Sequence, residues 1–213
     1  MDELELLKKD WKKEENKYPK LSYNDIYKMI LKKSSSIVKW IFIISLLEFV
    51  FWLSISFLLK ESKSTKSFDE LGANYIFIPL SILGYIILMY FFYQFYKNYK
   101  RISVTDSAKV LMENILKTRR TVKQYVAFNL IYMVVVSIFA VIVELSKNKE
   151  VLYKIEQASA NGEIFLFYVK VIGITLLILG LAIGILLVFY WLIYGILLKK
   201  LNRNYKELKK IEV

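Results

Sequence analysis

The chain has 213 residues, of which 56% are hydrophobic, and its formal net charge is +12. Ordinary soluble domains are about half apolar and lack long unbroken apolar runs, so this sequence predicts an integral membrane protein. It contains no cysteine and no histidine, which excludes disulfides, thiolate chemistry, Ser-His-Asp triads and metal sites built on these ligands. We therefore expect a non-enzymatic protein with no catalytic residues, no metal and no other cofactor.

Residues 1–36 form a charged N-terminal segment. The chain does not begin with the basic region, apolar run and small-residue cleavage site of a secretory signal peptide. Leucines and a tryptophan at helical spacing predict a helix over residues 2–17, which Pro19 ends. Ser22 and Asp25 then resemble a capping box and predict a second helix that continues into the membrane.

Four apolar stretches are long enough to cross a bilayer as helices, which takes about 20 residues each. They cover residues 37–59, 75–96, 125–145 and 171–198. The last exceeds a perpendicular span, so it is expected to tilt or protrude. The predicted fold is an all-α, four-helix membrane bundle over residues 37–198 with amphipathic cytoplasmic helical extensions.

The distribution of Lys and Arg predicts the orientation. Residues 1–36, 97–124 and 199–213 hold 23 of these side chains, whereas residues 60–74 and 146–163 hold six. Because cytoplasmic loops are enriched in Lys and Arg, both termini are predicted to be cytoplasmic. The basic face is expected to contact anionic lipid headgroups, and no pattern indicates nucleic-acid binding.

The connection over residues 97–124 has helical periodicity of its own, and the segment from Ser103 to Asp106 resembles a capping box. The second and third spans are thus expected to extend into the cytoplasm as a helical hairpin. The basic tail 199–213 follows the last span. The residues predicted to reach lipid headgroups are Arg119, Arg120, Lys123, Lys199 and Lys200.

Aromatic side chains lie near the predicted span ends, where such residues anchor helices at the membrane interface. These expected anchors are Trp40, Tyr75, Tyr96, Tyr125, Tyr168 and Tyr194. A denser group over residues 90–99 is expected to anchor as well, with a lipid or isoprenoid site as the alternative.

The run from Leu21 to Ser45, LSYNDIYKMILKKSSSIVKWIFIIS, continues to Glu48. It resembles the entry to the first span in a family of uncharacterised membrane proteins from Flavobacteria and other Bacteroidetes. The resemblance is strongest over residues 20–60 and implies a bacterial inner-membrane location. Members are sometimes labelled β-carotene monooxygenases, but carotenoid-cleaving enzymes hold iron with four histidines and this chain has none.

Glu48 falls in the middle of the first span, where a charged side chain is costly and faces inward as a rule. One interpretation is a neutral carboxyl group that makes one interhelical hydrogen bond. The other is a proton or cation site with Ser45, Asn129 or Tyr132 as neighbours. Asn129 is the second polar residue singled out within the spans.

Two further sets of residues are candidates for packing roles. Glu144 and Lys170 lie towards the outer side of the third and fourth spans, where they are expected to form an ion pair. Gly173, Gly180 and Gly184 form a small-residue face on the fourth span that predicts close helix packing, within the chain or in a homo-oligomer.

No catalytic motif, nucleotide-binding loop or transporter-like repeat is present. The favoured hypothesis is an interaction, regulatory or scaffold subunit with a membrane or cytoplasmic protein partner. One alternative is a small ion- or proton-coupled carrier or channel that uses Glu48. A further alternative is a membrane-anchored sigma-factor regulator, which would use the N-terminal segment.

Overall fold

The computed structural model describes residues 22–59, 72–105 and 107–211. In these ranges all regular structure is helical, which confirms the all-α class. Four of the helices are long and apolar enough to cross a membrane. The helix expected over residues 2–17 lies outside the described residues.

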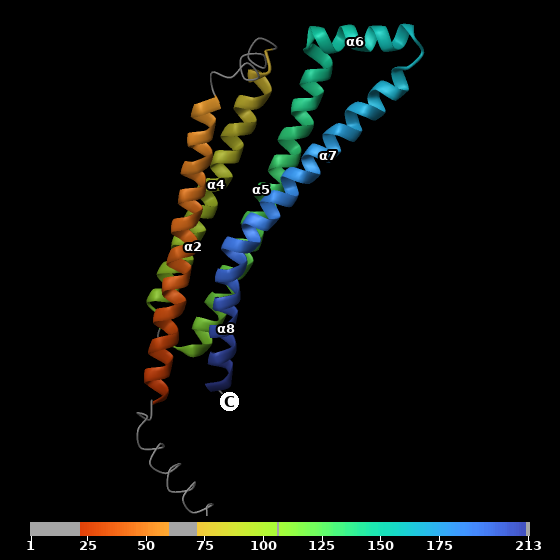
Figure 1. The fold of residues 1–213 in the computed structure, drawn as a ribbon. Coiled ribbons are helices and arrows are strands. Elements are labelled where there is room, and N and C mark those ends of the chain that lie inside the picture. The colour runs from red at the N-terminus through yellow and green to blue at the C-terminus, as the bar shows by residue number, and fades with distance from the viewer. Residues whose placement is uncertain (1–21, 60–71, 106, 212–213) are drawn as a thin grey trace, which may run out of the picture.

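The long helices run alternately up and down (Figure 1). A short helix connects the third long helix to the fourth, and a π-helical turn connects the fourth long helix to the last described helix. In chain order the elements are α2 (Tyr23–Leu59), α4 (Asn74–Ser103), α5 (Ala108–Lys147), α6 (Lys149–Ala160), α7 (Ile164–Tyr190), η1 (Trp191–Gly195) and α8 (Ile196–Ile211).

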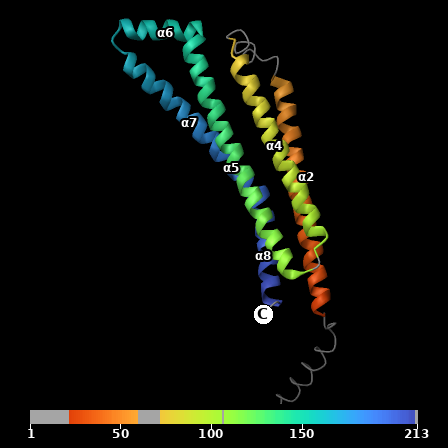
Figure 2. The same cartoon turned by 180° about the vertical axis from the view of Figure 1, so that it is seen from behind.

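Two ends of this assembly differ in charge. We call the end where α2 begins, α4 turns into α5 and α8 finishes the basic end, because the lysines and arginines of those segments gather there. The opposite end carries α6, which lies across the bundle direction, and we call it the α6 end. Seen from either side, α5 and α7 diverge towards the α6 end (Figure 2).

Local hydrogen bonds fix where the helices begin. The capping box at the start of α2 is confirmed, since Ser22 Oγ accepts from Asp25 N at 3.2 Å and Ser22 N donates to Asp25 Oδ2 at 3.2 Å. The predicted capping box at Ser103 is wrong, because α4 continues to that residue. Ser107 instead caps α5 by accepting from Val110 N at 3.3 Å.

Helix α6 was not predicted, because its segment reads as a short polar loop. Asn148 starts it by accepting from the N–H groups of Glu150 and Val151 at 2.9 and 3.4 Å. Gly162 ends it with φ of 71°, a left-handed conformation that glycine adopts without strain. Glu163 N then donates to Ala158 O at 2.7 Å, which closes the last turn.

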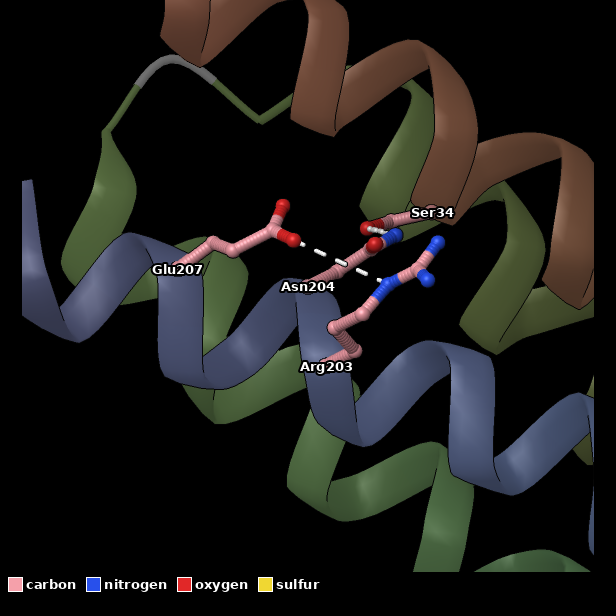
Figure 3. A network of polar contacts seen from close by, with 4 residues as sticks. All are labelled: Ser34, Arg203, Asn204 and Glu207. Atoms are coloured by element: carbon pink, nitrogen blue, oxygen red, sulfur yellow. Dashed lines mark hydrogen bonds and ion pairs between the residues drawn. The ribbon is translucent and has the colours of Figure 1, made fainter.

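The core has two parts. At the basic end α2, α4, α5 and α8 enclose an aliphatic cluster: Ile30, Val38, Ile102, Ala108, Leu111, Ile115, Leu201 and Leu208. Asn204 on α8 donates to Ser34 on α2 at 2.9 Å, and both side chains are buried (Figure 3). Two more α8 side chains, Arg203 and Glu207, pair at 3.7 Å with each other and stay exposed.

The second part of the core lies nearer the middle of the bundle and is mostly aromatic. It consists of Ile41, Phe91, Phe92, Phe95, Val122, Tyr125, Tyr190 and Tyr194. The aromatic residues between 90 and 99 are therefore not all interfacial: the three phenylalanines are in the core, Tyr99 is half-buried, and Tyr90, Tyr93 and Tyr96 are exposed. This aromatic core borders the candidate site.

Candidate functional site

Glu48 is the buried carboxylate of the bundle, with only 6% of its surface exposed. Three tyrosine hydroxyl groups donate to it. Tyr190 contacts Oε1 at 2.7 Å, while Tyr125 and Tyr194 both contact Oε2 at 3.0 Å. A carboxylate accepts hydrogen bonds, and a tyrosine hydroxyl group can donate one. The structure thus places three hydrogen bonds where the sequence predicted one.

The three tyrosines reach Glu48 from other helices than its own. Tyr125 comes from α5, Tyr190 is the last residue of α7, and Tyr194 lies in the π-helical turn η1. Their rings also contact one another, with centroids 5.9 Å apart for Tyr125 and Tyr194 and for Tyr190 and Tyr194. These contacts fix the hydroxyl groups around one carboxyl group and tie α2 to α5 and to the α7–α8 junction. Single π-helical turns recur at functional sites in proteins.

A cavity of about 380 Å³ begins at Glu48. This volume falls within the range of small-molecule sites, roughly 300–1,000 Å³. All four long helices contribute to its wall. The lining residues are Glu48, Phe49, Trp52, Leu53, Ser81, Gly84, Tyr85, Leu88, Tyr125, Asn129, Tyr132, Met133, Val136, Ser137, Leu186 and Tyr190.

The cavity extends from Glu48 in one direction only. On α2 its lining continues through Leu53, and on α5 through Ser137, both of which lie towards the α6 end. On the basic side of Glu48 the space is filled by the aromatic core, including Ile41 and Phe95, which are fully buried. Glu48 is therefore the closed end of the cavity.

Gly84 on α4 lets the cavity wall pack closely. A Cβ atom at this position would lie 2.8 Å from the ring of Tyr132 on α5. The Tyr132 hydroxyl group donates to Leu80 O on α4 at 3.2 Å. The absence of a side chain at Gly84 thus permits both the ring contact and the hydrogen bond.

Of the three neighbours expected around Glu48, two line the same cavity as Glu48. Ser45 donates to Phe42 O of its own helix at 2.8 Å. Asn129 and Tyr132 line the cavity, further along α5 than Tyr125. The hydrogen-bond partners of Glu48 are instead three tyrosines. Tyr125 and Tyr194 had been predicted as interfacial anchors, and Tyr190 had not been singled out.

Two of the expected interfacial anchors are wrong. Tyr125 and Tyr194 are 2% and 1% exposed and belong to the core. They lie at the ends of apolar stretches, but α5 and α8 continue past them, so these positions are inside the bundle. Tyr190 was not singled out, because it lies inside the fourth apolar stretch and not at its end. A signal was available in the spacing of Tyr190 and Tyr194, which puts both side chains on one helix face.

Glu144 and Lys170 are not brought together. Among the described residues, the ion pair formed is Arg203 with Glu207. Glu144 Oε1 accepts from Asn148 Nδ2 at 2.6 Å at the end of α5. The predicted ion pair fails because α5 and α7 diverge towards α6, where both residues lie (Figure 1).

The predicted glycine face does not pack against another described helix. Apart from the backbone of α7 itself and the adjacent residues, no described atom lies within 4 Å of a Cβ built on Gly173, Gly180 or Gly184. All three residues precede the cavity-lining residue Leu186 on α7, and α7 diverges from α5 towards the α6 end (Figure 1). Close packing of this face inside the chain is therefore not what the structure shows.

The basic residues predicted to meet lipid divide into two groups. Four are exposed: Arg120, Lys123, Lys199 and Lys200. Arg119 is half-buried and donates through Nη1 to Asn202 Oδ1 on α8 at 2.8 Å. Arg119 therefore joins α5 to α8.

In the part of the chain that the structure describes, no three acidic side chains gather as metal ligands would. The cavity offers one carboxylate, several hydroxyl groups and an amide in an apolar and aromatic wall. Such an arrangement can bind a small molecule and orient its polar head.

Comparison with known proteins gives a family. A family model described as a domain of unknown function (DUF8845) matches residues 24–213. No curated protein and no solved structure matches the chain.

Proposed function

We propose a function for this chain, which belongs to the family of the domain of unknown function DUF8845. The protein is a non-enzymatic, multi-pass membrane protein that holds a small, largely apolar molecule in the cavity next to Glu48. It serves as an interaction or regulatory subunit whose conformation depends on that molecule. The observation that carries this proposal is the Glu48 carboxylate, held by three tyrosine hydroxyl groups at the closed end of the cavity.

The shape of the cavity favours binding over transport. A channel needs a path on both sides of its coupling residue at once, and a carrier needs one on each side in turn. In this structure the cavity lies on one side of Glu48 and packed aromatic rings lie on the other. Glu48 also accepts hydrogen bonds from three other elements of the bundle, α5, α7 and η1. The carrier alternative would be supported by a flux in proteoliposomes that depends on protons or cations and is lost in folded Glu48→Gln.

The connection from the cavity to α8 supports a regulatory role. Tyr190 lines the cavity, and one turn further along the chain Tyr194 bonds the same carboxylate. Helix α8 follows directly and packs on α2 and α5 through the buried residues Leu201, Asn204 and Leu208. A ligand that shifts Tyr190 is thus connected to a basic surface helix that is suited to contact a partner.

We place the protein in the bacterial inner membrane with the basic end in the cytoplasm. The 23 Lys and Arg side chains of residues 1–36, 97–124 and 199–213 support this orientation. Exposed basic residues there would contact anionic headgroups. Reporter fusions at Asn16, Ser64, Ser107, Asn148 and Lys209 should read in, out, in, out, in. A periplasmic signal at Ser107 would overturn this orientation.

The binding role is tested with two matched serine variants. Ser137 and Ser54 each donate to the carbonyl group four residues earlier at 2.8 Å, but Ser137 lines the cavity and Ser54 is exposed on α2. Ser137→Phe should fill the cavity, while Ser54→Phe should leave it open. The full-length proteins are purified in mild detergent, and their bound small molecules are extracted and identified by mass spectrometry.

We expect one class of small molecule at near-stoichiometric amounts in wild type and Ser54→Phe, and its loss in Ser137→Phe. Equal recovery from all three proteins, or none from wild type, would contradict a binding role. Co-purification of a protein partner from the same extracts tests the regulatory part. The sigma-factor alternative involves the N-terminal segment, most of which lies outside the described residues.

A further inference from the structure

We infer that the ligand of the Glu48 cavity is an organic ammonium ion that carries at least one N–H group on an apolar body. This inference rests on the proposed binding function and specifies the chemical class of the ligand. It follows from three features of the cavity: the unused hydrogen-bonding capacity of Glu48, the charge of the wall and the composition of the wall.

The carboxylate has room for one more donor. Its two oxygens offer about four acceptor sites in total. Among the described residues, Oε2 accepts from Tyr125 and Tyr194, whereas Oε1 accepts from Tyr190 alone. One acceptor site therefore remains on Oε1, and Glu48 lines the cavity. A single N–H group of a ligand would complete the set.

The charge of the wall favours a cation. Among the described residues that line the cavity, Glu48 is the one with a carboxyl group, and none is Lys or Arg. The three tyrosine hydroxyl groups donate to the carboxylate but carry no positive charge. Because a buried charge is costly unless it is paired, a ligand of opposite charge is favoured over a neutral one. A fatty acid or phosphate head would instead bring a second negative charge next to the buried Glu48 carboxylate.

The rest of the wall suits the remainder of such a ligand. Aromatic rings from Phe49, Trp52, Tyr85 and Tyr132 line the cavity, and ring faces attract cations within about 6 Å. Leu53, Leu88, Val136 and Leu186 complete an apolar wall for the body of the molecule. The N–H requirement separates a primary, secondary or tertiary ammonium from a quaternary one, which has the same charge but no donor.

The test compares four probes of similar apolar body on the full-length protein in detergent. They are N,N-dimethylhexylamine, which is protonated at pH 7, hexyltrimethylammonium, hexanoate and 1-hexanol. Binding is followed by tryptophan fluorescence, since Trp52 lines the cavity. Trp52→Phe identifies the share of the signal that comes from this residue.

We expect the tertiary amine to bind wild type at least tenfold more tightly than the quaternary ion, and hexanoate to bind weakest. Glu48→Gln should weaken the tertiary amine at least tenfold. Glu113→Gln, which changes an exposed carboxylate at the basic end, should leave its binding unchanged. The comparison of the two amines in wild type stands even if Glu48→Gln does not fold.

Equal affinity for the two amines, or tight amine binding by folded Glu48→Gln, would overturn the inference. If 1-hexanol or hexanoate binds best and Ser137→Phe abolishes that binding, the ligand class is wrong while the binding function stands. If no probe binds, the ammonium inference also fails. The binding function is then judged by the extraction experiment, which uses no probe.

Discussion

Tyr190→Phe should be the most costly of the three hydroxyl deletions around Glu48. Tyr190 is the one protein donor to Oε1, at 2.7 Å, whereas Tyr125 and Tyr194 share Oε2 at 3.0 Å. Losing either shared donor leaves the other in place. Losing Tyr190 leaves one oxygen of a buried carboxylate without a partner from the described chain.

The magnitude follows from interhelical hydrogen bonds measured in membrane proteins, which average about 0.6 kcal/mol and reach about 1.7 kcal/mol. We expect Tyr190→Phe to cost about 1.5 kcal/mol of unfolding free energy, near the upper value, and Tyr125→Phe and Tyr194→Phe about 0.6 kcal/mol each. Tyr96→Phe is the control, since Tyr96 is 50% exposed. Its cost should be close to zero.

The assay is reversible unfolding in mixed micelles with increasing SDS, followed by circular dichroism. A double-mutant cycle with Glu48→Leu should remove the effect of Tyr190→Phe, because the acceptor is then gone. The reasoning is refuted if Tyr190→Phe costs no more than Tyr96→Phe. It is also refuted if its effect persists in full without the carboxylate.

Two further predictions concern packing and buried polar groups. Gly84→Ala should destabilise the bundle by about 1 kcal/mol in the same assay, because its Cβ would meet the ring of Tyr132 at 2.8 Å. Gly180→Ala should be neutral or stabilising, because no described atom outside its own helix lies within 4 Å of the new Cβ. Equal effects of the two substitutions would contradict this. Ser34→Ala should cost about 1–3 kcal/mol, because it leaves the buried Asn204 amide without its partner. The double variant with Asn204→Leu should recover part of that loss, and a double variant that is less stable than Ser34→Ala would argue against the pairing.

The helices themselves were readable from the sequence because bilayer-length apolar runs are a strong signal. Glu48 stood out for the same reason, as a carboxylate inside such a run. Where the helices end was less readable. The helical periodicity of residues 97–124 correctly predicted that α5 begins well before the apolar stretch at residue 125, but the cap was assigned to Ser103, whereas α5 begins at Ala108 and is capped by Ser107.

The partners of Glu48 could not be predicted because they depend on how the helices pack. A tyrosine at the end of an apolar stretch looks the same whether it faces a lipid headgroup or a buried carboxylate. Tyr125 and Tyr194 face the carboxylate because their helices extend beyond the apolar stretch. Similarly, Glu144 and Lys170 have matching depth in the sequence, but the divergence of α5 from α7 is a property of the whole bundle.

Cysteine labelling tests most directly whether the cavity ends at Glu48. The chain has no cysteine of its own, so single substitutions can be labelled without background. Ser137 lines the cavity, while Ser45 is 0% exposed, one helical turn from Glu48 on the basic side. In membranes, Ser137→Cys should react with N-ethylmaleimide, and Ser45→Cys should react only after unfolding in SDS. Reaction of Ser45→Cys in the folded protein at a rate comparable to that of Ser137→Cys would reveal a path past Glu48 and contradict the binding account.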